Sequence, residues 1–443
     1  MSHYISITPT EREEMLAAIG VGSLAELFDA VPAAQRFPAL DLPAPMSEIA
    51  LRRELGRLSG SNASAERMSI FLGAGAYNHF VPSAIDQIVR RSEFYTAYTP
   101  YQPEVSQGTL QATFEYQSMV CALTGMDVAN ASHYDGGTAM AEAAVMAAAA
   151  TRNRRKIVVA PSVNPQYRAV MRTLLLGSGL TIVGDENPEA TLDQVAALVD
   201  NTTAALIVQS PDFFGALHDL RPLVAKAHAA GALLAAHFDP IALALFQTPG
   251  EAGADIATGE GQPLGIGLTY GGPYLGMFCC RKEYVHKIAG RIVGLTTDVA
   301  GREAYVLTLR AREQDIRRER ATSNICTNQG LMALAAAVYL SLMGRQGMRK
   351  VAEICYQRAH YAAQHIAATP GYQVLDRGPF FKEFVVQCPQ PVAQVNARLR
   401  EHGIVGGYDL AQDYAHMGNA MLLAVTEMNS REEIDTLVAA LRL

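Results

Sequence analysis

The segment ALLAAHFD, from Ala232 to Asp239, is a short apolar run that follows Gly231 and ends in an acid. Continuous apolar runs of this length are typical of strands buried on both faces of a parallel sheet. Asp239 is therefore expected at the carboxyl end of its strand, which is the edge where open α/β sheets bind ligands. The run predicts an α/β protein with a candidate site beside Asp239.

A second short strand is predicted at residues 254–257, and it leads into the glycine-dense segment GEGQPLGIGLTYGGPYLG. This layout suggests a pyridoxal phosphate (PLP) site, in which a strand-end acid keeps the pyridinium nitrogen protonated and a lysine beyond a later strand forms the Schiff base. The acid is present, but there is no lysine from Asp239 to Met277. The nearest lysines, Lys226 and Lys282, fall on the preceding helix pattern and in a charged strand exit. The sequence predicts a PLP-like pocket without its nucleophile.

The rest of the chain alternates strands and helices. Strands are predicted at residues 126–131, 156–160, 180–183, 204–208, 232–236 and 254–257, with helical patterns between them. That order predicts a doubly wound, mostly parallel sheet. Residues 1–60 are expected to form an N-terminal helical arm, residues 61–330 the large domain, and residues 331–443 a small α+β domain with strands at 383–387 and 422–426.

Asp135-Gly136-Gly137-Thr138 opens an alanine-rich helix. Two glycines and a threonine at a helix N-terminus offer free amides and the positive end of the helix dipole, which suits a phosphate. An ordinary N-cap by Asp135 explains the same residues, so both interpretations stay open. Together with Asp239, these four residues form the candidate pocket.

Two further segments carry polar groups without helical or strand periodicity. Tyr98, Tyr101 and Glu104 lie in a loop rich in tyrosine and proline, which either faces a ligand or protein surface or serves only for packing. Five arginines precede the segment Ala321–Thr327: Arg310, Arg312, Arg317, Arg318 and Arg320. They form either a solvated basic face paired with nearby acids or an anion-binding cluster.

Composition narrows the class of protein. The chain has 443 residues, 49% of them hydrophobic, and a formal net charge of −7, which argues against a nucleic-acid partner. Its six cysteines show no CxxC or zinc-site spacing, so no metal site is expected. The start MSHYISITPT lacks the features of a signal peptide, and no apolar run reaches the ~20 residues of a membrane span. A cytoplasmic protein without membrane contact is expected.

Six segments between Phe71 and Val438 resemble the glycine cleavage system P-protein family, and within it the subunit 1 (alpha) branch of the two-chain glycine dehydrogenase (decarboxylating). They are FLGAGAYNHFVPS, TPYQPEVSQGTLQATFEYQ, DGGTAMAEA, GGPYLGMF, RRERATSNICTNQGL and VTEMNSREEIDTLV. The resemblance implies a fold type I PLP-transferase architecture. It also implies a reaction in which glycine is decarboxylated and its aminomethyl group passes to the lipoyl arm of H protein.

In the two-chain form of this family the PLP lysine belongs to the beta subunit, whereas the present chain reads TGEGQPLG at the matching place. The resemblance therefore implies a non-catalytic alpha subunit of an α2β2 heterotetramer, inactive alone, with no covalent PLP of its own. It also implies that residues of two segments lie near the partner's active-site mouth and the subunit interface: Tyr98, Tyr101, Glu104, Thr322, Ser323 and Asn324.

Two alternatives are a self-sufficient fold type I PLP enzyme and a scaffold protein without chemistry. The missing lysine argues against the first, because the internal Schiff base requires it. The polar loop around Tyr98 argues against the second.

Overall fold

The computed structural model describes residues 6–152, 154–321 and 323–442. The chain divides into two units, Met1–Ala63 and Ser64–Leu443. In the first unit, α1 (Pro9–Ile19) begins with a capping box between Thr8 and Glu11, and α2 (Glu48–Gly60) is capped by Ser47. None of the described residues of this unit is buried. The arm therefore has no hydrophobic core of its own.

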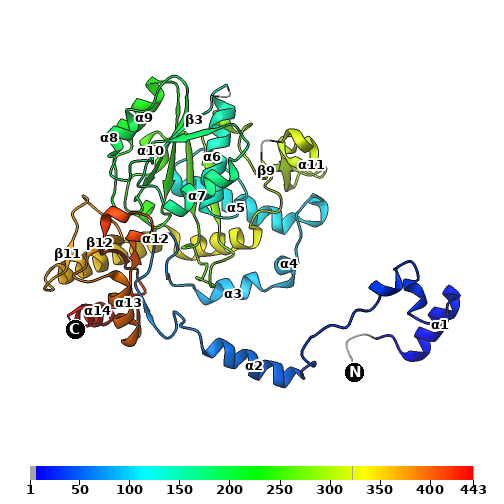
Figure 1. The fold of residues 1–443 in the computed structure, drawn as a ribbon. Helices are drawn as coiled ribbons and strands as arrows, with labels where there is room; N and C mark the ends of the chain where they lie inside the picture. The colour runs from blue at the N-terminus through cyan, green and yellow to red at the C-terminus, as the bar shows by residue number, and fades with distance from the viewer. Residues whose placement is uncertain (1–5, 153, 322, 443) are drawn as a thin grey trace. The chain divides into compact units, whose positions relative to one another are not determined.

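A sheet forms the centre of the second unit (Figure 1). It has seven strands in the order β2-β8-β7-β6-β5-β3-β4. The strands are β2 (Val128–Ala129), β3 (Lys156–Val159), β4 (Thr181–Val183), β5 (Thr203–Ser210), β6 (Leu233–Phe238), β7 (Ile256–Glu260) and β8 (Gly276–Cys280). The pairs from β4 to β7 are parallel, and β8 runs antiparallel to β7 and β2. The expected mostly parallel, doubly wound sheet is confirmed.

Both faces of this sheet are covered, which explains why its strands are mostly apolar. Along β8, Phe278 and Cys280 pack into the cluster around α6 (Gly136–Ala150), whereas Met277 and Cys279 pack into the cluster around α5 (Gln107–Thr124) and α12 (Gly330–Ala367). The covering helices also include α3 (Ser83–Val89), α7 (Pro165–Leu174), α8 (Leu192–Ala196), α9 (Arg221–Ala229) and α10 (Pro249–Ala252). The alanines of α6 let its backbone approach the sheet closely.

Between β8 and α12 the chain forms a hairpin that the sequence analysis did not predict. Strands β9 (Ile292–Thr297) and β10 (Glu303–Thr308) pair antiparallel and are followed by the short α11 (Gln314–Arg317). Helix α12 then runs toward the C-terminal elements, with a break at Gly344, where φ is 53° (Figure 1). No helix in the described part of the chain is long and apolar enough to cross a membrane.

A four-stranded antiparallel sheet of order β11-β12-β15-β14 follows α12. Its strands are β11 (Gln373–Val374), β12 (Glu383–Gln387), β14 (Tyr408–Asp409) and β15 (Ala420–Ala424), and α13 (Val392–Glu401) and α14 (Arg431–Leu441) complete this part. The last strand begins and ends two residues before its predicted place. In addition, β1 (Ser69–Ile70) pairs with β13 (Ile404–Val405). That pairing anchors the segment after residue 70 between the two sheets. The domain boundary expected at residue 330 stays a prediction.

Candidate functional site

Asp239 follows β6, as predicted, and is held by its own turn. Its Oδ1 accepts hydrogen bonds from the amides of Ile241 and Ala242. Its Oδ2 lies 2.6 Å from Nζ of Lys382, which stands just ahead of β12, and the two side chains are 12% and 2% exposed. Burial alone raises the pKa of Asp239, but the charge and hydrogen bond of Lys382, together with His79 and the Ala242 amide, outweigh it and the pKa is lowered. The carboxylate of Asp239 is therefore already paired with the ammonium group of Lys382.

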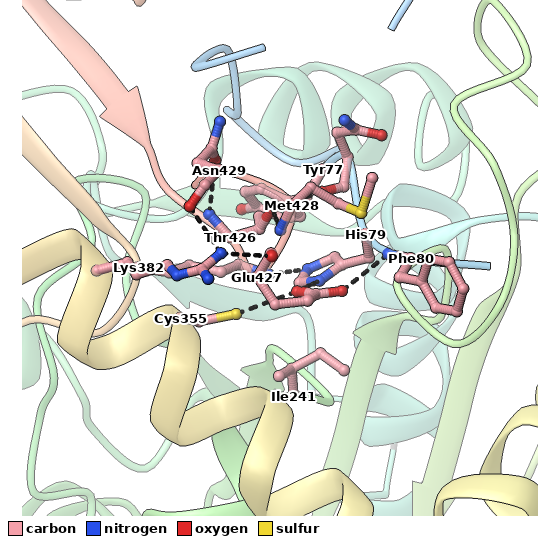
Figure 2. A network of polar contacts seen from close by, with 12 residues as sticks. Tyr77, His79, Phe80, Ile241, Cys355, Lys382, Thr426, Glu427, Met428 and Asn429 are labelled. Carbon is pink, nitrogen blue, oxygen red and sulfur yellow. Dashed lines mark hydrogen bonds and ion pairs between the residues drawn. The ribbon is translucent and has the colours of Figure 1, made fainter. Parts of the chain in front are cut away.

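The ion pair continues into a buried polar network (Figure 2). His79 Nε2 lies 3.0 Å from Lys382 Nζ, and His79 Nδ1 lies 2.7 Å from Oε2 of Glu427. Cys355, on α12, donates from Sγ to the same Oε2 at 3.3 Å, and the Phe80 amide donates to Oε1. Burial, together with the charge of Lys382, lowers the pKa of His79, so a neutral imidazole that accepts from Lys382 and donates to Glu427 fits both contacts.

His79, Cys355 and Glu427 are also residue types that bind metals, and their donor atoms lie within 4.8 Å of one another. These atoms are bonded to each other, however, and the ammonium group of Lys382 supplies a positive charge beside them. The contacts favour a network of hydrogen bonds that needs no metal.

The N-terminus of α6 was predicted to be either a phosphate cradle or an ordinary cap. Asp135 Oδ1 accepts from the Thr138 amide at 2.7 Å, which forms a capping box. The Gly136 amide donates instead to Oε2 of Glu260, the last residue of β7, at 2.9 Å. Glu260 Oε1 accepts from the amides of Gln262 and Leu275. A carboxylate of the chain itself thus occupies the place where a phosphate would bind.

Little space remains between Glu260 and Asp239. The cavity that both residues line has a volume of about 30 Å³, which is about the share of one water molecule. A Cβ built at Gly136 would lie 3.1 Å from each of three atoms, in Glu260, His237 and Tyr167. Small-molecule pockets usually span about 300–1,000 Å³. The residues of this pocket do not fit PLP.

Tyr167 also lines a larger hollow of about 360 Å³. Asp135, Gly137 and Glu260 line it together with Tyr274 and Tyr408. Asp135 at its wall opposes the binding of a phosphate by charge repulsion, and Glu260, whose pKa burial raises to about 7, does so only where it is ionised. This hollow therefore does not provide the phosphate site that was one prediction for the N-terminus of α6.

The residues expected at a subunit interface lie away from this pocket. Tyr98 is 74% exposed, and Glu104 is exposed in the turn Pro103–Val105. Tyr101 is partly buried and accepts a hydrogen bond from Nη2 of Arg291 at 3.0 Å. Tyr98 and Glu104 are therefore exposed and Tyr101 is held by Arg291, and the expected contact of all three with a partner stays a prediction.

Ser323 and Asn324 belong to the second expected interface segment. Ser323 Oγ donates to Glu142 on α6 at 2.8 Å, and burial raises the pKa of Glu142 to about 7. Asn324 is exposed, and Thr322 lies outside the described residues. Arg291 donates to the carbonyl of Cys326 as well as to Tyr101, so one arginine connects the two segments.

Sequence analysis missed the groups that fill the pocket. Glu260 lies within TGEGQPLG, where the absent lysine was the only feature considered, and Lys382 and Glu383 interrupt the apolar run FFKEFVV. A charged residue inside such a run is a weak signal of a buried ion pair. His79 and Glu427 gave no signal that identifies them as partners.

Comparison with known proteins gives consistent results. Residues 2–441 match the family model described as glycine cleavage system P-protein. The chain is 53% identical to a probable glycine dehydrogenase (decarboxylating) subunit 1 of Thermomicrobium roseum, covering 98% of both chains. It is 52% identical to the protein of the same description in Moorella thermoacetica, covering 99% of both.

Two solved structures are also similar. A crystal structure of glycine decarboxylase (P-protein) of the glycine cleavage system, in inhibitor-bound form, matches 100% of this chain and 99% of its own. The TM-score is 0.92 and the identity 41%. A sphingosine-1-phosphate lyase of Burkholderia pseudomallei matches 93% of both chains with a TM-score of 0.65 at 17% identity, a likeness of fold alone.

Proposed function

From the premise that this chain belongs to the glycine cleavage system P-protein family, as subunit 1 of a glycine dehydrogenase (decarboxylating), we propose that it is the subunit without PLP. In this proposal the chain completes the active site of a beta subunit, which holds the cofactor in an α2β2 assembly. The assembly decarboxylates glycine and passes its aminomethyl group to lipoylated H protein. The cytoplasmic location expected from the sequence stays a prediction.

The observation that carries the proposal is the filled pocket beside Asp239. Lys382 pairs with the strand-end acid, and Glu260 accepts the helix amide that a phosphate would need. An incoming PLP would have to displace both groups, each of them buried and charged or hydrogen-bonded. Separating a buried ion pair typically costs about 3–5 kcal/mol, which makes this pocket a poor competitor for the cofactor.

Two exposed regions support a partner-dependent role over a scaffold without chemistry. The arm places large apolar side chains in solvent, among them Leu40 and Leu42 at 71% exposure each. Several large exposed apolar side chains in one segment are typical of a site of protein association. Tyr98 and Glu104 add polar groups that a neighbouring active site can use.

Glycine–bicarbonate exchange tests the proposal. The chain, its presumed beta partner and lipoylated H protein are assayed separately and together, with PLP supplied. We expect exchange only when both subunits and H protein are present. Exchange by this chain with H protein, in the absence of the partner, would instead favour a self-sufficient PLP enzyme.

A further inference from the structure

Three tyrosine rings line the hollow of about 360 Å³, which shares Tyr167 and Glu260 with the filled pocket. The tyrosines are Tyr167 on α7, Tyr274 just ahead of β8 and Tyr408 on β14, so separate segments of the chain bring them together. The volume falls within the range of about 300–1,000 Å³ that small-molecule pockets span. Aromatic rings around one cavity are typical of sites that bind organic cations, because the ring faces carry partial negative charge. None of the proposed roles uses this hollow.

Two of these tyrosines direct their hydroxyl protons to other groups. Tyr274 donates to the carbonyl of Leu268 at 2.9 Å, and Tyr408 donates to Oδ2 of Asp413 at 2.6 Å. A hydroxyl has only one proton, so neither group can also donate to a ligand in the hollow. Their rings remain available, and ring faces favour a cation over an anion.

A carboxylate supplies negative charge to the same wall. Oδ1 of Asp135 accepts from the Thr138 amide and hydroxyl, whereas Oδ2 has no hydrogen-bond partner among the described residues. Glu260 is 6% exposed and adds charge where it is ionised. The lining residues that the structure describes include no lysine, arginine or histidine. The N-terminus of α6 contributes about half a positive charge, which the full charge of Asp135 outweighs.

The electric field in the hollow is therefore negative. Burial, followed by the charges of Glu260 and Asp135, raises the pKa of Tyr167, because a further negative charge there is unfavourable. The same field stabilises a positive charge. A molecule with its own carboxylate, such as an amino acid, gains less, because no described side-chain cation in the wall faces that group.

We propose that this hollow binds a small organic ammonium ion through its three tyrosine rings and the carboxylate of Asp135. A primary ammonium group donates to Oδ2 of Asp135, whereas a quaternary ion binds by charge and ring contacts alone. The inference goes beyond the proposed function and depends on this chain alone. A failure of glycine–bicarbonate exchange therefore leaves it intact.

The test is an NMR titration of the full chain with tetramethylammonium chloride, in which the N-methyl signal reports binding and sodium chloride keeps the ionic strength constant. We expect one saturable site per chain. tert-Butanol, a neutral molecule of similar size, should not displace the ion at equal concentration. Displacement by tert-butanol would show that the hollow selects apolar molecules and would overturn the proposal.

Two variants test the residues. Asp135→Asn removes the charge and keeps the N-cap of α6, since asparagine caps a helix as well as aspartate does. We expect it to weaken binding about fivefold or more. Tyr274→Leu, which removes one ring, should weaken binding about threefold to tenfold. Asp193→Asn, which changes an exposed acid in the first turn of α8, is the matched control.

The absence of a saturable site in the parent chain would overturn the proposal, as would unchanged binding in Asp135→Asn or in Tyr274→Leu. If Tyr274→Leu fails to fold, Asp135→Asn decides the matter, because it preserves the shape of the side chain.

Discussion

Nζ of Lys382 lies 2.6 Å from Oδ2 of Asp239, at the strand end where a PLP enzyme of this fold would hold its pyridinium nitrogen. The two residues lie next to strands of different sheets, because Asp239 follows β6 and Lys382 precedes β12. The pair therefore joins the central sheet to the C-terminal sheet by a buried charge contact. The cation that neutralises Asp239 is thus a side chain of the protein itself.

Replacing Lys382 by methionine should destabilise the chain. The variant Lys382→Met leaves the carboxylate of Asp239 buried without its cation, and removing one partner of such a pair typically costs about 3–5 kcal/mol. Urea unfolding measures the loss. Lys350→Met, at an exposed position of α12, is the control and should change stability little. A loss below about 1 kcal/mol in Lys382→Met would mean that the pair contributes little.

Because the buried carboxyl group of Glu142 resists ionisation, the free energy of unfolding of the chain should fall as pH rises. Burial raises its pKa from 4.5 to about 7, so between these pH values the folded chain keeps a proton that the unfolded chain has lost. Its contribution is thus complete below pH 4.5 and is lost as pH rises to about 7. Relative to the parent, Glu142→Gln should gain about 2–3 kcal/mol across this range. Urea titrations at several pH values, with exposed Glu401→Gln as the control, measure the gain. If the unfolding free energies of the parent and of Glu142→Gln changed with pH in parallel, the prediction would be wrong.

Deleting Met1–Met46 should weaken assembly more than folding. The described residues of the arm bury no side chain, so the urea midpoint of the remaining chain should stay close to that of the parent. The exposed apolar residues are expected to contact the partner, and their loss should weaken association by about tenfold or more. Sedimentation velocity of subunit mixtures measures this. Unchanged assembly would show that the arm has another role.

Tyr98 and Glu104 are expected to reach the active site of the partner. If Glu104 makes a buried charge-assisted hydrogen bond there, Glu104→Gln should slow turnover of the assembled complex about 10- to 100-fold, and Tyr98→Phe should lower it as well. Each variant is first shown to match the parent in assembly and thermal stability. Tyr356→Phe, on α12, is the matched control. Full activity in both loop variants would mean that the loop serves only for packing.

The sequence predicted those parts of the fold that depend on local pattern. Apolar runs located the central strands and residues 383–387, and the motif at Asp135 located the start of α6. The sequence predicted a strand ahead of Lys282 but not the antiparallel direction of β8, and it did not predict the hairpin of β9 and β10, because strand direction and pairing depend on tertiary contacts rather than on composition. For the same reason it missed the pair formed by Lys382 and Asp239 and the contact of Glu260 with Gly136. Those partners meet only in the folded chain.

The measurement that tests the account most directly is the location of PLP in the assembled complex. The complex is saturated with PLP, reduced with borohydride, digested and analysed by mass spectrometry. We predict one pyridoxyl group per beta subunit and none on this chain, because Lys382 is held by Asp239 and Glu260 occupies the phosphate position. A stoichiometric pyridoxyl adduct on Lys382, Lys226 or Lys282 of this chain would contradict the account.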